Sequence, residues 1–384
     1  MIRRSMLAAC LALYLISASA AGVPSSSPGE RSGFDSLLRA AERAQEENRD
    51  DEAITLFRRA LVLRPESEEV LWFLGTLLYA KDQYAESCDD LRRFLALRTD
   101  AGSGWAFLGL GEFQLRQYRR ALEHLQRGFN AGLGDRKELA HAVLYDTAIL
   151  LTRAERYDDS VDLLAKMLAD DAHDLTLVQA LGLAGLRLPL LPSEIPEDRR
   201  EFVDLAGRAV LALELQEPDE AETTFHRLLA MYPEEPGVHF LFGASLMQLH
   251  PELAVAEFQQ ELRVSPSHVL ARVRIAEQLI ANGDFDRALS TVREAIRLDP
   301  KRASAHMLAG EALIGKGNLS EGIAELETAR TADLDMIRTH WDLLHAYVAA
   351  GRKDDVDREK QQVDRLLHGN SSTHLGEPGD VSHK

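Results

Sequence analysis

Cysteine is nearly absent from this chain of 384 residues, which holds only Cys10 and Cys88. Cys10 lies in an N-terminal segment that we expect to be removed, so a disulfide scaffold is excluded and stability must come from packing. Cys88 lies within a helical stretch. We interpret it as a small buried core residue; the alternative is a redox or cross-linking thiol.

The sequence also lacks the patterns that carry catalysis. It has no strand-like alternation, no Gly-rich phosphate loop after a strand, and no His-Glu-x-x-His spacing among its thirteen histidines. His340 and His345 flank Trp341, but they are five residues apart and do not share a helix face well. Acidic pairs such as Asp89-Asp90 are typical of helix starts and exposed faces. We therefore predict no catalytic residue, no cofactor and no metal site.

Positive charge is in short supply. The chain has 62 acidic residues against 44 Lys and Arg, which gives a formal net charge of −18. An acidic surface repels nucleic-acid phosphates and anionic lipids, and no basic patch in the sequence offsets it. We expect no nucleic-acid partner and no peripheral membrane binding.

One apolar run stands apart from the rest of the chain, at its start. Arg3 and Arg4 precede an apolar stretch at residues 6–16, and residues 18–20 read Ala-Ser-Ala. This order predicts a signal peptide over residues 1–20 and export to a periplasm or the cell exterior. Two alternatives remain open, an uncleaved membrane anchor and lipidation at Cys10.

What the sequence has in abundance is repetition at a spacing of 34 residues. The recurring positions are Gly283, Gly317 and Gly351; Pro266 and Pro300; Gly75 and Gly109; Tyr84 and Tyr118; and Phe57, Leu91 and Leu125. Each period holds two amphipathic helical patterns. A unit of this size buries its apolar face only by stacking on its neighbours, so the pattern predicts an all-α solenoid of helix-turn-helix repeats.

The glycines predict two kinds of backbone environment. Gly75, Gly109 and Gly310 fall in mid-helix, where glycine costs about 1 kcal/mol relative to alanine, so we expect a close approach of the paired helix there. Gly317 and Gly351 fall between helices, where a left-handed turn favours glycine.

The repeats divide the rest of the chain into five segments. We expect a flexible leader at 21–33, a first array at 34–187, a Pro-rich extended insertion at 188–199, a second array with a polar capping helix at 200–368, and a disordered tail at 369–384. Pro189, Pro192 and Pro196 forbid a regular helix in the insertion. We interpret the insertion as a substitute for a missing second helix; the alternative is a binding surface.

The cleanest unit carries the columns Ile275-Ala276, Phe285, Ala288, Val292, Ala295 and Pro300. These columns resemble the tetratricopeptide repeat over residues 34–186 and 200–368, in about eight or nine units. The resemblance implies a right-handed superhelix whose concave face, lined mainly by the first helix of each repeat, binds an extended peptide or a partner segment.

Carried onto this chain, the resemblance predicts a peptide- or protein-binding groove. Its candidate residues are Trp72, Thr76, Tyr79, Leu110, Phe113, Tyr145, Ile149, Phe240, Met247, Ile280, Met307, Ile314, Arg338, Trp341 and His345. The alternative is that neighbouring helices bury these side chains as ordinary core. Chaperone-binding members of the family grip a terminal carboxylate with Lys, Asn and Arg; here those places are mostly apolar, which favours an apolar or amphipathic partner segment.

Together these patterns predict a non-catalytic protein-interaction scaffold that is exported from the cytoplasm. The alternative from another class is a structural subunit that self-associates in a cell-envelope assembly. An enzyme built around the Pro-rich insertion is a third reading, for which the sequence offers no catalytic constellation.

Overall fold

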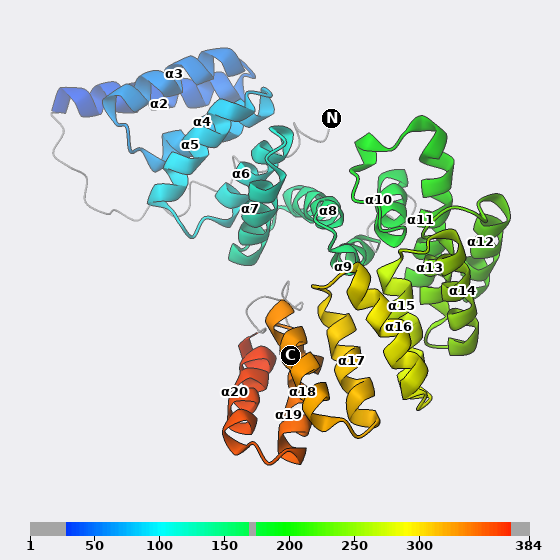
Figure 1. Ribbon diagram of the computed structural model, residues 1–384. Helices are drawn as coiled ribbons and strands as arrows, with labels where there is room; N and C mark the ends of the chain where they lie inside the picture. The colour runs from blue at the N-terminus through cyan, green and yellow to red at the C-terminus, as the bar shows by residue number, and fades with distance from the viewer. Residues whose placement is uncertain (1–27, 169–173, 370–384) are drawn as a thin grey trace, which may run out of the picture. The chain divides into compact units, whose positions relative to one another are not determined.

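The computed structural model describes residues 28–168 and 174–369. These residues form nineteen α-helices and no strand, which confirms the predicted all-α repeat fold (Figure 1). They fall into two compact units, residues 28–168 and 174–184 with 188–195, and residues 185–187 with 196–369. None of the helices in these described ranges is both long and apolar enough to cross a membrane.

The N-terminal unit contains four helical hairpins and a ninth helix. Its elements are α2 (Pro28–Glu46), α3 (Asp50–Leu63), α4 (Glu68–Ala80), α5 (Tyr84–Leu97), α6 (Gly102–Gln114), α7 (Tyr118–Ala131), α8 (Lys137–Arg153), α9 (Tyr157–Met167) and α10 (Leu175–Gly185). The second helix of each of the first three hairpins packs on the first helix of the next, and α4, α6 and α8 contact in turn. Each hairpin thus completes the core of its neighbour.

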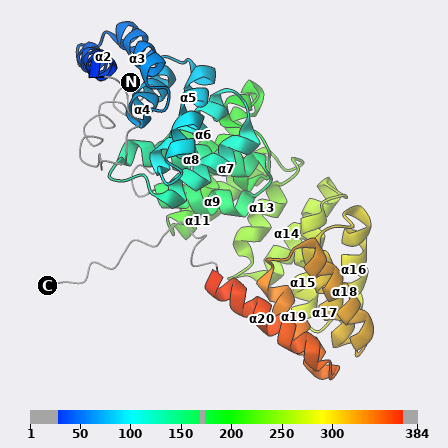
Figure 2. The ribbon, with the colours of Figure 1, turned by 90° about the vertical axis from the view of Figure 1, so that its left-hand side faces the viewer.

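The C-terminal unit contains five hairpins of the same kind. Its elements are α11 (Arg200–Glu214), α12 (Pro218–Met231), α13 (Val238–Leu246), α14 (Pro251–Val264), α15 (Val269–Ala281), α16 (Phe285–Leu298), α17 (Ala303–Gly315), α18 (Leu319–Ala332), α19 (Ile337–Ala349) and α20 (Lys353–Gly369). Figure 2 shows α20 along the end of this stack, beside α19.

A left-handed residue closes nearly every hairpin turn, and glycine takes this place in the last three hairpins of the C-terminal unit, whereas its α11–α12 turn uses Gln216 with φ of 59°. In the C-terminal unit, Gly283, Gly317 and Gly351 have φ of 75°, 85° and 69°, as predicted. In the N-terminal unit the equivalent turns use non-glycine residues, for example Asp82 and Arg116, with φ of 60° and 58°. The hydrogen bonding is the same: the N–H that follows the turn residue donates to a carbonyl five residues back in the first helix.

The mid-helix glycines lie where helices approach closely, as predicted. A Cβ atom on Gly109 would lie 2.7 Å from Cγ of Leu125, and one on Gly310 would lie 2.6 Å from Cγ of Leu326. These separations are too short for a side chain. The apolar side chain of the second helix therefore fills the space that glycine leaves on the first.

The Pro-rich insertion follows a hairpin turn that leads to no second helix. Arg187 has φ of 55°, and the N–H of Leu188 donates to the carbonyl of Leu183 (2.9 Å), which is the closure used in the other turns. Two short 3-10 turns then form, η2 (Pro192–Glu194) and η3 (Glu197–Arg199), so the segment is less extended than predicted. Leu191 and Ile195 are buried, as expected of a segment that covers the stack.

Helix α2 begins at Pro28, inside the segment predicted to be a flexible leader. Proline suits the first turn of a helix because its fixed φ is already helical and no N–H partner is needed there. The predicted signal peptide lies outside the described residues, as does the predicted tail apart from Gly369, which ends α20.

Candidate protein-binding surface

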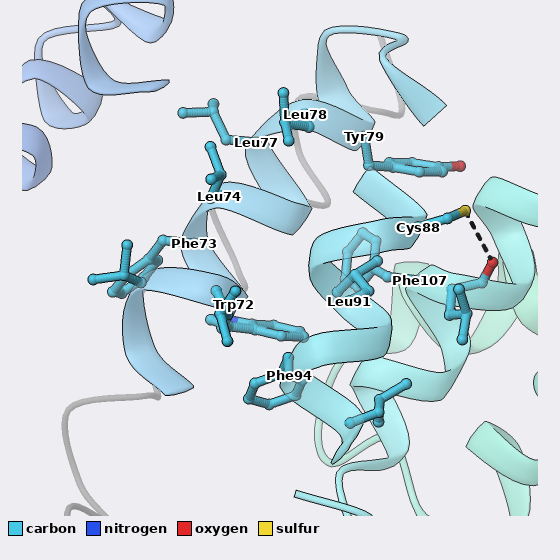
Figure 3. Close-up of a cluster of buried hydrophobic side chains, with 14 of the residues drawn as sticks. Trp72, Phe73, Leu74, Leu77, Leu78, Tyr79, Cys88, Leu91, Phe94 and Phe107 are labelled. Carbon is cyan, nitrogen blue, oxygen red and sulfur yellow. Dashed lines mark hydrogen bonds between the residues drawn. The ribbon is translucent and has the colours of Figure 1, made fainter. Parts of the chain in front are cut away.

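The predicted groove residues of the N-terminal unit lie mostly inside its core. Trp72 is only 3% exposed and packs between Phe94 and Phe107, with ring centroids 5.4 and 5.7 Å away (Figure 3). Tyr79 is also buried and contacts the same Phe107 ring edge-on. These aromatic side chains fill the space between successive hairpins.

The remaining candidates on α4, α6 and α8 are buried or half-buried. The Thr76 hydroxyl donates back to the carbonyl of Trp72 (2.9 Å), so its polar atom is satisfied within its own helix. Leu110 and Ile149 are buried, while Phe113 and Tyr145 are partly covered. The N-terminal unit therefore presents little of the predicted row to solvent.

Cys88 belongs to the same core, as interpreted from the sequence. It is fully buried, its thiol lies 3.9 Å from the carbonyl of Leu108, and burial raises its pKa to about 11. A thiol in this environment remains protonated at neutral pH and is shielded from oxidants.

The predicted residues of the C-terminal unit fall into three groups. Phe240 and Met307 are buried, and Phe240 packs against Phe258 and His268 at 5.5 and 4.7 Å. Met247, Ile280 and Ile314 are half-buried. Arg338, Trp341 and His345, all on α19, are exposed.

The exposed residues of α19 form a continuous stripe along one face of the helix. The α19 stripe comprises Arg338, Trp341, His345 and Val348 at the spacing of one helix face, together with Leu334 in the turn that precedes the helix. Leu334 is 61% exposed, Trp341 41% and Val348 61%, which places three large apolar side chains in water. The indole of Trp341 lies against the His345 imidazole, with ring centroids 6.3 Å apart.

A network of charges crosses three first helices beside the stripe. Arg338 of α19 donates to Glu277 of α15 at 2.9 Å and to Glu311 of α17 at 3.0 Å. Glu277 also pairs with Arg274 at 3.0 Å. The guanidinium of Arg338 thus ties together the faces of three consecutive repeats.

Glu311 has a second acidic neighbour, Asp342. Burial and the charge of Asp342 raise the pKa of Glu311 to about 7. Burial also raises the pKa of Asp342. The network therefore gains negative charge as the pH rises through neutrality. Among residues 28–168 and 174–369, no group of three or more His, Cys, Asp or Glu is placed to hold a metal ion.

His306 and His340 each connect a first helix to neighbouring segments of the chain. Nε2 of His340 lies 2.9 Å from the carbonyl of Leu334, and Nδ1 lies 2.5 Å from Glu359. His306 makes the corresponding contacts one repeat earlier, with Pro300 and Glu325. Both side chains hold a first helix to the turn before it and to the helix after it.

The family comparison agrees with this hairpin geometry. A model of the tetratricopeptide repeat matches residues 38–103 and 273–335, one region in each unit. The chain contains tetratricopeptide repeats. No protein with a curated description matches it significantly.

Solved structures that resemble the chain are also built of such repeats. MamA (residues 41 to end) from Desulfovibrio magneticus RS-1 shares 22% identity over 47% of this chain and 98% of its own, with a TM-score of 0.38. Yeast Tom70 shares 13% sequence identity over 88% of this chain and 92% of its own, with a TM-score of 0.34. TTC0263 from Thermus thermophilus shares 20% sequence identity over 44% of this chain and 95% of its own, with a TM-score of 0.35.

The tetratricopeptide period explains why Trp341 is exposed. Val273, Met307 and Trp341 occupy one column, each 34 residues after the last. Val273 and Met307 are buried in the cluster to which Leu344 of α19 also belongs. Trp341 is in the final repeat, where no described helix follows to cover it. Sequence periodicity identifies the column, but whether a residue of the column is exposed depends on whether a further hairpin packs over it.

Sequence reasoning missed three participants of this surface. Val348 extends the stripe, and the helical spacing from Trp341 would have found it; Leu334 lies in the turn before α19, where helical spacing gives no signal. Asp342 lies 31 residues after its partner Glu311, which is not the repeat period, so no column signals that pair.

Proposed function

We propose that this tetratricopeptide-repeat protein is an exported, non-catalytic scaffold that holds an apolar or amphipathic segment of a partner protein on the first-helix face of its C-terminal unit. Arrays of such repeats typically bind other proteins through the extended surface of their first helices. The α19 stripe is where this chain offers that surface most openly. Export is proposed from the signal-like order of residues 1–20.

One observation carries the binding proposal: Trp341 and Val348 are both exposed on one face of α19, and Leu334 is exposed in the turn before it. Exposed large apolar side chains in a row mark an interaction surface, because leaving them in water forgoes the free energy of burial. Tryptophan is also the residue most enriched among those that dominate binding energy.

The test compares two baits in extracts of the native host. Full-length protein and its Trp341→Ala variant would capture partners for quantitative mass spectrometry, with Leu253→Ala, another exposed apolar position in the same unit, as the matched control. We expect the partner to be lost from the Trp341→Ala bait and kept by Leu253→Ala. Equal capture by all three proteins would contradict the proposal.

Export is tested separately from binding. Cell fractionation followed by N-terminal sequencing should find the protein outside the cytoplasm with Ala21 as its first residue. A cytoplasmic protein that still begins at Met1 would remove export from the proposal and leave the binding surface standing.

A further inference from the structure

The end of the C-terminal unit is polar on one side and apolar on the other. In the penultimate repeat, Ile323 and Leu326 of α18 are buried in a core cluster that also contains Leu343 and Leu344 of α19. One period later, the same columns hold Asp357 and Lys360 of α20, and both are exposed. The second-helix side of the final repeat is therefore adapted to face water.

The first-helix side has not been adapted in the same way. The columns of Met307 and Ile314 continue as Trp341 and Val348, which remain apolar although they are exposed. Had the whole end been selected only for solubility, both helices would carry polar residues there. The contrast indicates that the exposed face of α19 is covered by a binding partner, whereas the exposed face of α20 remains in water.

We propose that the α19 stripe binds a single basic amphipathic helix of a partner protein, in the position that the first helix of a further repeat would take. This inference rests on the proposed function and specifies the partner segment. On α19 the stripe runs from Arg338 to Val348, which corresponds to about 15 Å of helix, so about ten residues of the partner would lie along it.

A lone helix fits this end better than a second copy of the chain does. Another hairpin stacked as a complete repeat would also cover Asp357 and Lys360 and would bury their charges at a cost. A lone helix packs at about 8–10 Å from α19 and leaves α20 in water. The charged outer face of α20 therefore disfavours self-association through this end.

The charges beside the stripe favour a basic partner. Glu277, Glu311 and Asp342 lie beside Arg338, and Glu277 also pairs with Arg274, so three carboxyl groups face two guanidinium groups next to Trp341. The whole chain has the same sign, with a formal net charge of −18. Lys or Arg at the edge of an incoming helix would meet an attractive potential, whereas acidic residues would be repelled.

The test uses a phage-displayed library of random peptides of about 16 residues, long enough to follow the stripe, selected on the full-length protein. We expect enriched peptides to carry a net positive charge and apolar residues at helical spacing. Their Kd, measured by fluorescence anisotropy, should weaken at least tenfold with Trp341→Ala and with Val348→Asp, and about threefold with Asp342→Asn. Leu253→Ala should leave the Kd unchanged.

The outcomes separate this inference from the function on which it rests. Peptides that are acidic, or that bind Trp341→Ala and Val348→Asp as tightly as the parent protein, would overturn the helix site while a binding function elsewhere stands. A library that yields no binder would count against both. A concentration-dependent dimer that Trp341→Ala abolishes, seen by light scattering, would show that a second copy is the occupant and would also overturn the inference.

Discussion

The two units build the same hairpin, yet they place their first-helix aromatic residues in opposite environments. On α4, every residue from Val70 to Tyr79 is buried, including Trp72. On α19, Trp341 belongs to the same family of repeat positions and stands in solvent. The difference comes from position in the array: Trp72 has a following hairpin to cover it, and Trp341 has none among the described residues. Residue type alone does not distinguish a core aromatic from a binding one.

The largest test of this comparison replaces the two tryptophans in turn. Trp72→Ala should lower the free energy of unfolding by about 3–5 kcal/mol, because it opens a cavity between Phe94 and Phe107. Trp341→Ala should change it by less than about 1 kcal/mol. Urea denaturation followed by circular dichroism measures both. Similar losses for the two variants would mean that Trp341 is also core.

A buried glutamate in the N-terminal unit should make stability fall at acid pH. Glu112 accepts hydrogen bonds from Arg92 (2.8 Å) and His124 (2.6 Å); burial alone would raise its pKa, but these partners lower it below the usual 4.5. Its contribution is therefore complete above about pH 4.5 and is lost as the pH falls through the lower folded value. Glu112→Gln should cost about 2 kcal/mol near pH 7, and the difference should shrink in acid. A constant difference from pH 7 to pH 3 would contradict this assignment.

The contribution of Glu311 in the C-terminal unit to the free energy of unfolding should change with pH in the opposite direction. Its folded pKa of about 7 lies above its ordinary value, so between about pH 4.5 and 7 the folded protein holds a proton that the unfolded chain has lost. Its contribution to stability falls as the pH rises through this window. Glu311→Gln, which mimics the protonated form, should be more stable than the parent by about 1 kcal/mol near pH 8 and equal to it near pH 5. The exposed Glu321→Gln serves as the control.

The smallest effects should come from exchanging the turn residue between a non-glycine turn of the N-terminal unit and a glycine turn of the C-terminal unit. Arg116 sits at φ of 58°, where a side chain is strained, so Arg116→Gly should raise the free energy of unfolding by about 0.5–1 kcal/mol. Gly317→Ala should lower it by about 1 kcal/mol; a Cβ there meets open space, so backbone conformation alone sets the cost. Thermal melting of both variants measures the pair, and changes of equal sign would refute the explanation.

Periodicity made much of this fold predictable. The 34-residue spacing located the hairpins, the left-handed glycines at Gly283, Gly317 and Gly351, and the close approach at Gly75, because each follows from local helix geometry. The left-handed turns at Arg116 and Arg187 carry no comparable signal. Their residues do not favour the conformation, and the surrounding helices impose it.

The binding surface was predictable only in part, for a physical reason. Arg338, Trp341 and His345 were named from their columns and do lie exposed on one face. Trp72 and Met307 were named by the same rule and are buried, since burial depends on the packing of the following hairpin. The position of a residue in the repeat predicts which face of its own helix it lies on. Whether that face is buried depends on the tertiary packing of the next hairpin, which the repeat position does not specify.

The location of the α19 stripe on the last described hairpin has a consequence for dynamics. Within the described residues, the α19–α20 pair packs on one neighbouring hairpin only, so it should open more readily than the α13–α14, α15–α16 and α17–α18 hairpins, which pack on two. A segment that binds there would supply the missing contacts and slow amide exchange in α19 and α20. Occupancy of the surface would then be thermodynamically linked to the order of the array's terminus.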